Sequence, residues 1–173
     1  KYKDFYALKN VNLTIPKGEI YGLVGENGAG KTTLIRLLTG LNFKSEGEII
    51  LFGHKDNLQH ERSKIGCTIE MPALYKDMTA SQNLEVQRIQ RGIPNKKCIT
   101  DTLELIGLSN AGKKRVANFS LGMKQRLALG VALLGEPEFL ILDEPVNGLD
   151  PTGIIELREL LKKLVKEREV TIL

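Results

Sequence analysis

"GENGAGKT", residues Gly25–Thr32, is the stretch that decides the fold. It matches the pattern G-x-x-x-x-G-K-[ST] in full, after a short apolar run that predicts a buried strand (19–25) and before a helical pattern. Glycines let the backbone of such a loop turn successive N–H groups toward one anion, and the following helix adds the positive end of its dipole. The loop therefore predicts a nucleotide phosphate site, not a glycine-rich turn with a chance lysine.

The residue types of this loop suggest specific contacts. Lys31 would reach the β- and γ-phosphates as a point charge, and Thr32 offers a hydroxyl oxygen to Mg²⁺. The expected nucleotide-binding positions are Gly25, Glu26, Asn27, Gly28, Ala29, Gly30, Lys31, Thr32 and Thr33.

"FLILDEP", residues 139–145, supplies carboxylates for the same site. Four apolar residues predict a buried strand that holds Asp143 at its C-terminal end, where ligands bind in open α/β sheets. There Asp143 would bind Mg²⁺, and Glu144, on the other side of the strand end, would polarise a water for attack on the γ-phosphate. A cap or surface role would explain the acidic pair by itself, but the loop at 25–32 favours the catalytic interpretation.

Strand and helix patterns alternate along the rest of the chain. A strand is expected at 47–53, helices from Leu121 and over 152–168, and a further strand at 170–173. This alternation predicts an α/β fold with a largely parallel sheet. Residues 76–116 are charged, polar and helical in pattern, with turn signals at "RGIPN" and "SNAGKK". We expect a small helical subdomain at 76–116, inserted between core segments 1–75 and 117–173.

The bulk composition is that of an ordinary globular domain. The 173 residues carry 25 basic and 21 acidic side chains, a net charge of +4 that does not indicate nucleic acid. Cys67 and Cys98 lie far apart and outside any metal-ligand spacing, so free thiols of a reducing compartment are expected. No apolar run is long enough for a membrane span. Because the chain opens without methionine and stops within the strand pattern "VTIL", we expect it to be a fragment.

With two further motifs, "FSLGM" (119–123) and "NGLD" (147–150), the chain resembles the nucleotide-binding domains of ABC (ATP-binding cassette) ATPases over essentially its whole length. "FSLGM", whose serine lies 23 residues before Asp143, is similar to the family signature L-S-G-G-Q. The resemblance implies a P-loop NTPase (RecA-like) core with an antiparallel β portion, and ATP and Mg²⁺ as cofactors. It also implies a head-to-tail dimer, in which Ser120 and the Gly122 backbone contact the γ-phosphate bound by a second subunit. A plain N-cap role for Ser120 is compatible with that contact.

Three more positions follow from the resemblance. It implies that Tyr2 stacks on adenine, that Asp150 communicates across the dimer interface, and that Glu70 stands where most relatives have a Mg²⁺-contacting glutamine. A packed edge aromatic and a helix-opening turn are the alternative interpretations of Tyr2 and Asp150. Leu121 and Met123 depart from the usual signature, and the family's switch histidine would lie beyond Leu173.

The motifs "IE-x-P-x-LY" and "FSLGMKQR" are similar to those of the bacitracin- and lantibiotic-resistance branch of ABC exporters. This implies an ATPase subunit, bound on the inner face of the cell membrane to a separate transmembrane permease, that exports antimicrobial peptides or drugs. A soluble ABC ATPase acting on ribosomes or DNA stays open as an alternative. Ser120 follows Lys31 by 89 positions, and the segment between them has no heptad run or cysteine cluster, which favours transport. A kinase or GTPase is disfavoured, because the N-K-x-D base-reading motif is missing and Glu144 favours hydrolysis.

Overall fold

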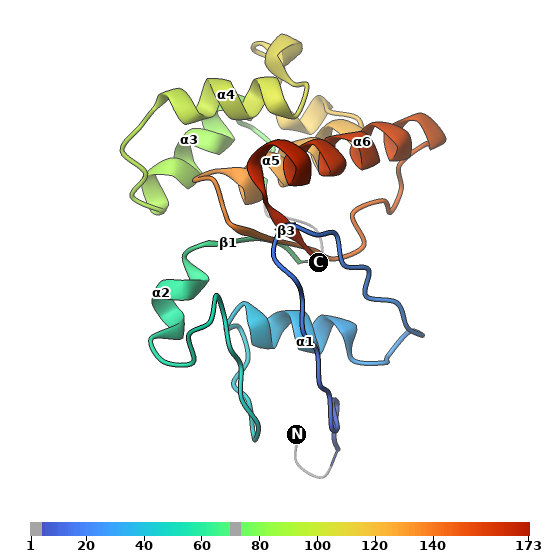
Figure 1. Cartoon of the computed structure of the whole chain (residues 1–173). Coiled ribbons are helices and arrows are strands. Elements are labelled where there is room, and N and C mark those ends of the chain that lie inside the picture. Colours follow the sequence, from blue (N-terminus) through green and yellow to red (C-terminus); the bar gives the residue numbers. More distant parts are fainter. Residues whose placement is uncertain (1–4, 70–73) are drawn as a thin grey trace.

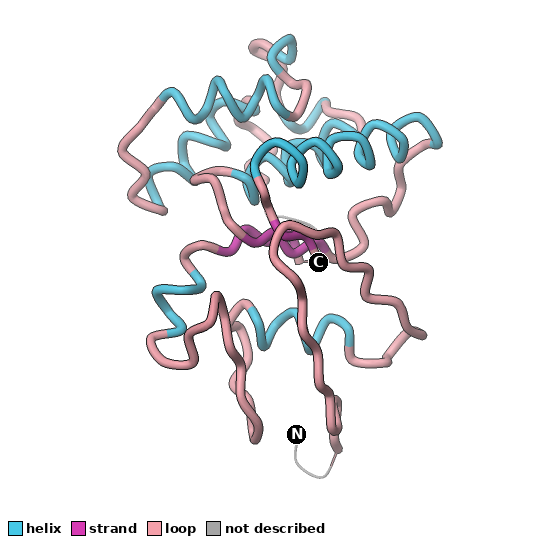
Figure 2. Tube along the Cα trace, in the orientation of Figure 1, coloured by secondary structure: helices cyan, strands magenta, loops and turns pink. Residues whose placement is uncertain are grey.

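The structure, a computed structural model, describes residues 5–69 and 74–173 (Figure 1). In chain order its elements are α1 (Lys31–Leu38), α2 (Leu58–Arg62), β1 (Ile65–Thr68), α3 (Ala80–Gln90), α4 (Lys97–Leu105), η1 (Ser109–Ala111), η2 (Val116–Asn118), α5 (Leu121–Leu133), β2 (Phe139–Leu142), α6 (Pro151–Arg168) and β3 (Thr171–Ile172). Loops connect much of the N-terminal part, and helices dominate the part after residue 74 (Figure 2).

The described strands form one parallel sheet in the order β1-β2-β3. Phe139 at the start of β2 pairs with Ile65 on one side and Thr171 on the other, so β2 lies in the centre. The alternating sequence pattern predicts parallel strands that are connected through helices, and this is the arrangement observed. The α/β fold class is therefore confirmed.

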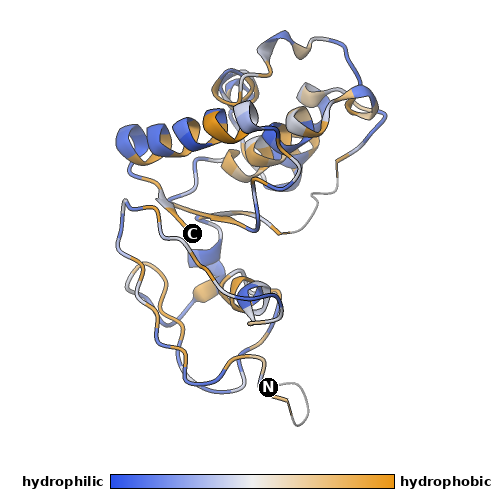
Figure 3. Cartoon of the chain, turned by 90° about the vertical axis from the view of Figure 1, so that its right-hand side faces the viewer, coloured by the Kyte–Doolittle hydropathy of each residue, from blue (hydrophilic) through white to orange (hydrophobic). Residues whose placement is uncertain are grey.

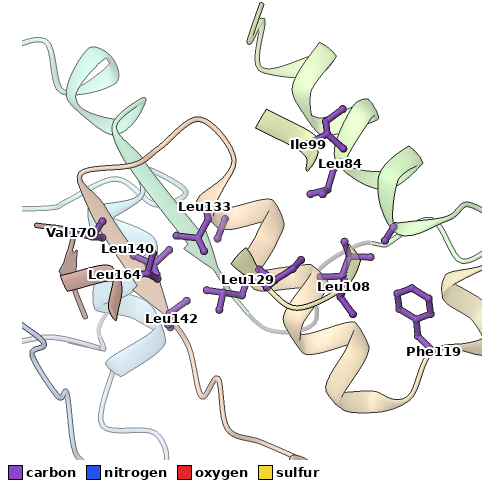
Figure 4. Packing of buried hydrophobic residues seen from close by; sticks show 14 of the residues in the cluster. Leu84, Ile99, Leu108, Phe119, Leu129, Leu133, Leu140, Leu142, Leu164 and Val170 are labelled. Atoms are coloured by element: carbon purple, nitrogen blue, oxygen red, sulfur yellow. The ribbon is translucent and has the colours of Figure 1, made fainter. Parts of the chain in front are cut away.

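β2 is buried on both faces, because its side chains alternate between two hydrophobic clusters. Leu140 and Leu142 join the larger cluster with residues of α3–α6, whereas Phe139 and Ile141 join a smaller one with Ile35 of α1. Helices α3–α6 accordingly lie on one side of the sheet and α1 on the other (Figures 1 and 3). The close-up in Figure 4 shows Leu129 and Leu133 of α5 packed near Leu140 and Leu142 of the sheet. This packing on both faces fixes the C-terminal end of β2, and Asp143 is the residue that follows it.

Two glycines let α5 pack closely against its neighbours. A Cβ atom on Gly66 of β1 would lie 2.1 Å from the Ala132 carbonyl oxygen, and one on Gly130 of α5 would lie 2.6 Å from Ile106 Cδ1. Such distances are far inside van der Waals contact, so any larger residue would push the elements apart. Helix α5 is therefore held at a fixed depth against both the sheet and α4.

The helical pattern predicted for residues 76–116 is present as α3, α4 and the short turns that follow. Its buried residues Leu84, Ile99 and Val116 belong to the same hydrophobic cluster as Leu140 of β2. The segment thus shares a core with the sheet. Division of the chain at residues 75 and 117 stays a prediction.

Other sequence expectations differ from the structure in detail. Segment 19–25 forms no strand: Ile20 makes a single parallel bridge to Ile172, and Val24 is 94% exposed. The reason is that the neighbouring strand β3 is only two residues long, so it has few backbone groups with which segment 19–25 could pair. Segment 47–53 also forms no strand, because positive φ angles of 52° and 82° at Phe52 and Gly53 turn the backbone. Among the described residues, antiparallel pairing is limited to isolated bridges, Leu51–His54 and Thr79–Arg115.

Two elements were missed by sequence reasoning, β1 and the five-residue helix α2. Four residues interrupted by a glycine, "IGCT", carry almost no strand signal. In contrast, the helix expected over 152–168 is α6, and its apolar stripe packs on the core as predicted. The stripe residues that do so are Leu157, Leu160, Leu161, Leu164 and Val165.

The contact between β1 and α5 can be tested with Gly66→Ala. We expect a loss of roughly 2–3 kcal/mol in the free energy of unfolding, because the new methyl group meets backbone that cannot move aside. Gly22→Ala is the matched control, since a Cβ there meets nothing within 4 Å, and we expect a change below about 1 kcal/mol. Urea unfolding of both variants measures the difference, and equal stability would contradict the proposed packing constraint.

Candidate functional site

The loop at residues 25–32 owes its shape to glycine. Gly28 and Gly30 have φ angles of 82° and 94°, in the left-handed region that residues with a Cβ rarely adopt. The loop is also closed by a hydrogen bond from the Ala29 N–H to the Glu26 carbonyl, 3.1 Å long. A Cβ on Gly30 would lie 2.6 Å from the Ala7 carbonyl oxygen, so the tight approach of the N-terminal segment requires glycine there as well.

Positive charge gathers at this loop. The Lys31 ammonium donates hydrogen bonds to the carbonyl oxygens of Gly25 (2.6 Å) and Glu26 (2.9 Å), which holds it against the loop. Helix α1 begins at Lys31 without a side-chain cap and with no acidic residue in its first turn. Uncapped N–H groups, the helix dipole and an ammonium group at one place favour an anion, and a phosphate is the anion that this loop geometry suits.

Two residues far apart in sequence meet beside the loop. The Thr32 hydroxyl donates to Asp143 Oδ2 over 3.3 Å, across 111 positions of sequence. Asp143 is fixed in turn because its N–H donates to the Thr68 carbonyl of β1 over 2.9 Å. The structure therefore brings together the hydroxyl and the carboxylate that the sequence suggested as metal ligands.

This pair of oxygens suits Mg²⁺ held together with a nucleotide. Mg²⁺ takes one or two protein oxygens and completes its octahedron with waters and substrate phosphates. Within residues 5–69 and 74–173, no group of three or more His, Cys, Asp or Glu side chains is positioned to hold a metal alone. The donor set therefore fits a metal shared with phosphates and not an all-protein metal cage.

Glu144 follows at the exposed start of a turn. Its φ angle is 48°, and the Asn147 N–H donates to the Glu144 carbonyl over 3.1 Å, closing the turn. The Asn147 side-chain amide also donates to Glu144 Oε2. Sequence reasoning included Asn147 in the motif "NGLD" but gave it no role, although an amide three residues after a carboxylate and two after a proline is a typical turn signal.

The remaining described candidates, Ser120, Gly122 and Asp150, lie together around a cavity of about 1010 Å³ between α5 and α6. The Ser120 hydroxyl accepts from the Met123 N–H over 3.2 Å and caps α5. The Asp150 carboxylate accepts from the Gly153 N–H, also over 3.2 Å, and caps α6. None of the described residues 25–33 lines this cavity. The chain thus presents two separate groups of phosphate-site candidates.

Other candidates fall outside these two groups. Tyr2 and Glu70 lie outside the described residues. Cys67 and Cys98 are free thiols, as expected. Burial raises the pKa of the Cys67 thiol, which keeps it protonated and disfavours a nucleophilic role.

A parallel sheet, a glycine-rich loop that leads into a helix and a carboxylate at the end of the central strand together define a P-loop NTPase domain. Residues 8–147 match the sequence profile of the ABC transporter family. The chain belongs to this family and is one of its ATP-binding domains.

Individual relatives agree with this assignment. The bacitracin transport ATP-binding protein BcrA of Enterococcus faecalis is 44% identical over 99% of this chain and 56% of its own length. The lantibiotic transport ATP-binding protein SrtF of Streptococcus pyogenes is 48% identical over 92% of this chain and 69% of its own length. The chain thus spans little more than half of BcrA. The expected resemblance to bacitracin and lantibiotic transport ATP-binding proteins is confirmed.

Among solved structures, the chain is similar to the dimeric post-hydrolysis state of the ATP-binding cassette MJ0796 bound to ADP and Pi. The TM-score is 0.84 at 30% sequence identity, and the match covers 96% of this chain and 78% of MJ0796. The match confirms the P-loop NTPase core.

The capping role of Ser120 can be measured separately from any role in phosphate binding. Ser120→Ala removes the acceptor for the Met123 N–H, and we expect a loss of about 1 kcal/mol in unfolding free energy. Ser120→Asp keeps an acceptor at the same position, so its stability should match the parent protein. Thermal unfolding without nucleotide compares the three proteins. Equal stability of the alanine variant and the parent would contradict the capping role.

Proposed function

We propose that this domain binds Mg²⁺–ATP and hydrolyses it to ADP and phosphate as the ATP-binding subunit of an ABC transporter. The hydrogen bond between Thr32 and Asp143 is the observation that carries the proposal. It places the end of the phosphate loop next to the end of β2, where Glu144 follows. Loop, metal ligands and a candidate base therefore occupy one edge of the sheet.

Each candidate residue has a role in this reaction. Lys31 and the N–H groups of residues 25–33 hold the phosphates, since they supply positive charge and donors at the start of α1. Thr32 and Asp143, with Glu70, would hold Mg²⁺, which when bound neutralises charge on the β- and γ-phosphate oxygens. Tyr2 would stack on the adenine ring.

Glu144 is proposed as the group that orients the attacking water. The water attacks the γ-phosphorus, the bond from phosphorus to the bridging oxygen breaks, and ADP leaves with that oxygen. The proton lost by the water passes to the Glu144 carboxylate, which is exposed at the strand end and so is accessible to a water. Products are ADP and inorganic phosphate, so the atoms balance without a further reactant.

Ser120, Gly122 and Asp150 act in our proposal on a nucleotide held by a second subunit. They lie around a cavity that excludes the chain's own loop, so their contact with a phosphate requires another molecule. The dimeric structure of MJ0796 bound to ADP and Pi supports a pair of such domains, which we propose to be arranged head to tail. The γ-phosphate would then bridge two subunits, and its loss would open the dimer.

The relatives support a proposal for the transported substrate and the partner. We propose export of antimicrobial peptides or drugs, a proposal supported by the names of BcrA and SrtF, a bacitracin and a lantibiotic transport ATP-binding protein. In the part of the chain that the structure describes, each helix is too short or too polar to cross a bilayer. A separate permease would supply the membrane passage and hold the domain at the inner face of the membrane, and 76–116 would be the helical subdomain that faces it.

Substitution of the proposed base gives the most direct test. In the full-length protein, Glu144→Gln should retain ATP binding and lose at least about 100-fold in turnover, because a neutral amide cannot accept the proton. Sedimentation with Mg²⁺–ATP, with Mg²⁺–ADP and without nucleotide should reveal a dimer with ATP alone. Turnover near the parent rate would contradict the role of Glu144 as the base. A monomer under all three conditions would contradict dimer formation driven by ATP alone.

Measurements of ATP binding by the monomer can distinguish the proposed phosphate contact of Lys31 from that of Ser120. Lys31→Ala should weaken ATP binding strongly, because the ammonium group at the phosphate loop is lost. Ser120→Arg should leave monomer binding within about threefold of the parent and prevent dimer formation, because its bulk obstructs the contact across the subunits. Titration with a fluorescent ATP analogue measures both variants. An equal loss of binding in both would place Ser120 in the same-chain site.

A further inference from the structure

The turn after β2 contains an interaction that the proposed mechanism has not used. Glu144 and Asn147 are both exposed, yet the Asn147 amide nitrogen donates to Glu144 Oε2. The backbone of the turn favours this contact, since the Asn147 N–H donates to the Glu144 carbonyl over 3.1 Å. Residues at the two ends of such a turn have side chains within reach of each other.

We propose that Asn147 is a positioning residue that fixes the carboxylate of Glu144 for water activation. This inference rests on the proposed role of Glu144 as the base. Asn147 acts through Glu144 and takes no proton itself.

The chemistry of the two groups supports this role. An ionised carboxylate only accepts hydrogen bonds, so the amide must present its NH₂ group and not its oxygen. One carboxylate oxygen is thereby held, and the other keeps acceptor sites for a water. A free glutamate side chain samples many rotamers, whereas a catalytic base must be held within about 0.5 Å of its productive position. The amide restricts that freedom without adding charge.

Asn147 is itself connected to another element. The Gln125 side-chain amide of α5 donates to the Asn147 carbonyl oxygen over 3.4 Å, a long hydrogen bond. Helix α5 begins at the Ser120 cap, and its position is set by the close contacts of Gly66 and Gly130. The turn that carries Glu144 is therefore supported from a rigidly packed helix and not only by local hydrogen bonds.

Two substitutions separate positioning from a purely structural role in the turn. Asn147→Ala removes the donor and the turn-forming side chain. Asn147→Asp keeps the size and the turn preference of asparagine, but it cannot donate when ionised and it adds a like charge beside Glu144. A structural role predicts that aspartate substitutes well. A positioning role predicts that aspartate is at least as harmful as alanine.

The experiment measures ATP hydrolysis by the full-length protein together with its permease. Both Asn147 variants should lower kcat about ten- to hundredfold and leave KM for ATP within about twofold, since a hydrogen bond to a charged group is lost without a phosphate contact. Asn95→Ala is the matched control. The Asn95 side chain also makes one local hydrogen bond, from the Lys97 N–H over 2.9 Å, but it lies in the helical segment. Its kcat should equal that of the parent. Thermal unfolding of every variant should show a folded protein.

The outcomes are distinct. An Asn147→Asp variant with the parent kcat would overturn the positioning role, as would a raised KM at unchanged kcat. Glu144→Gln distinguishes this failure from failure of the proposed function. If Glu144→Gln is inactive while Asn147→Asp is fully active, only the inference about Asn147 fails. If Glu144→Gln hydrolyses ATP at the parent rate, the proposed base fails and the inference fails with it.

Discussion

The hydrogen bond between Thr32 and Asp143 is the contact on which the proposed phosphate site at residues 25–33 depends. It exists because β2 is buried on both faces and cannot shift relative to α1 or α5. Asp143 is thereby presented at a defined point, and its N–H bond to the Thr68 carbonyl fixes it further. The proposed Mg²⁺ site needs this rigidity at Thr32 and Asp143, because Mg²⁺ tolerates little deviation from octahedral geometry.

The division of candidate residues into two groups gives the fold its proposed mode of action. Lys31 lies against its own loop, whereas Ser120 and Asp150 lie at a separate cavity between α5 and α6. In the proposed dimer, one chain would supply half of each of two sites, and a nucleotide would link the subunits. Ser120 and Asp150 also cap their helices, so the same side chains stabilise the domain and orient the N–H groups of each first helical turn.

Sequence reasoning succeeded where the signal is local or strongly periodic. The loop at 25–32 needs glycine at positive φ angles, and α6 shows a continuous apolar stripe. It failed for segments 19–25 and 47–53, which are apolar but have almost no strand to pair with. It also missed β1, because four residues with one glycine become a strand only beside β2 and beneath α5.

By itself the sequence determined the phosphate loop, the apolar strand before Asp143 and the family, since residue type and spacing within a short segment suffice for each. The tertiary structure decided which of these segments meet. Long-range packing alone places Thr32 beside Asp143 and leaves Ser120 at a different cavity. The hydrogen bond of Asn147 to Glu144 likewise needed the structure, because it depends on the left-handed φ angle of Glu144, which residue identity does not dictate.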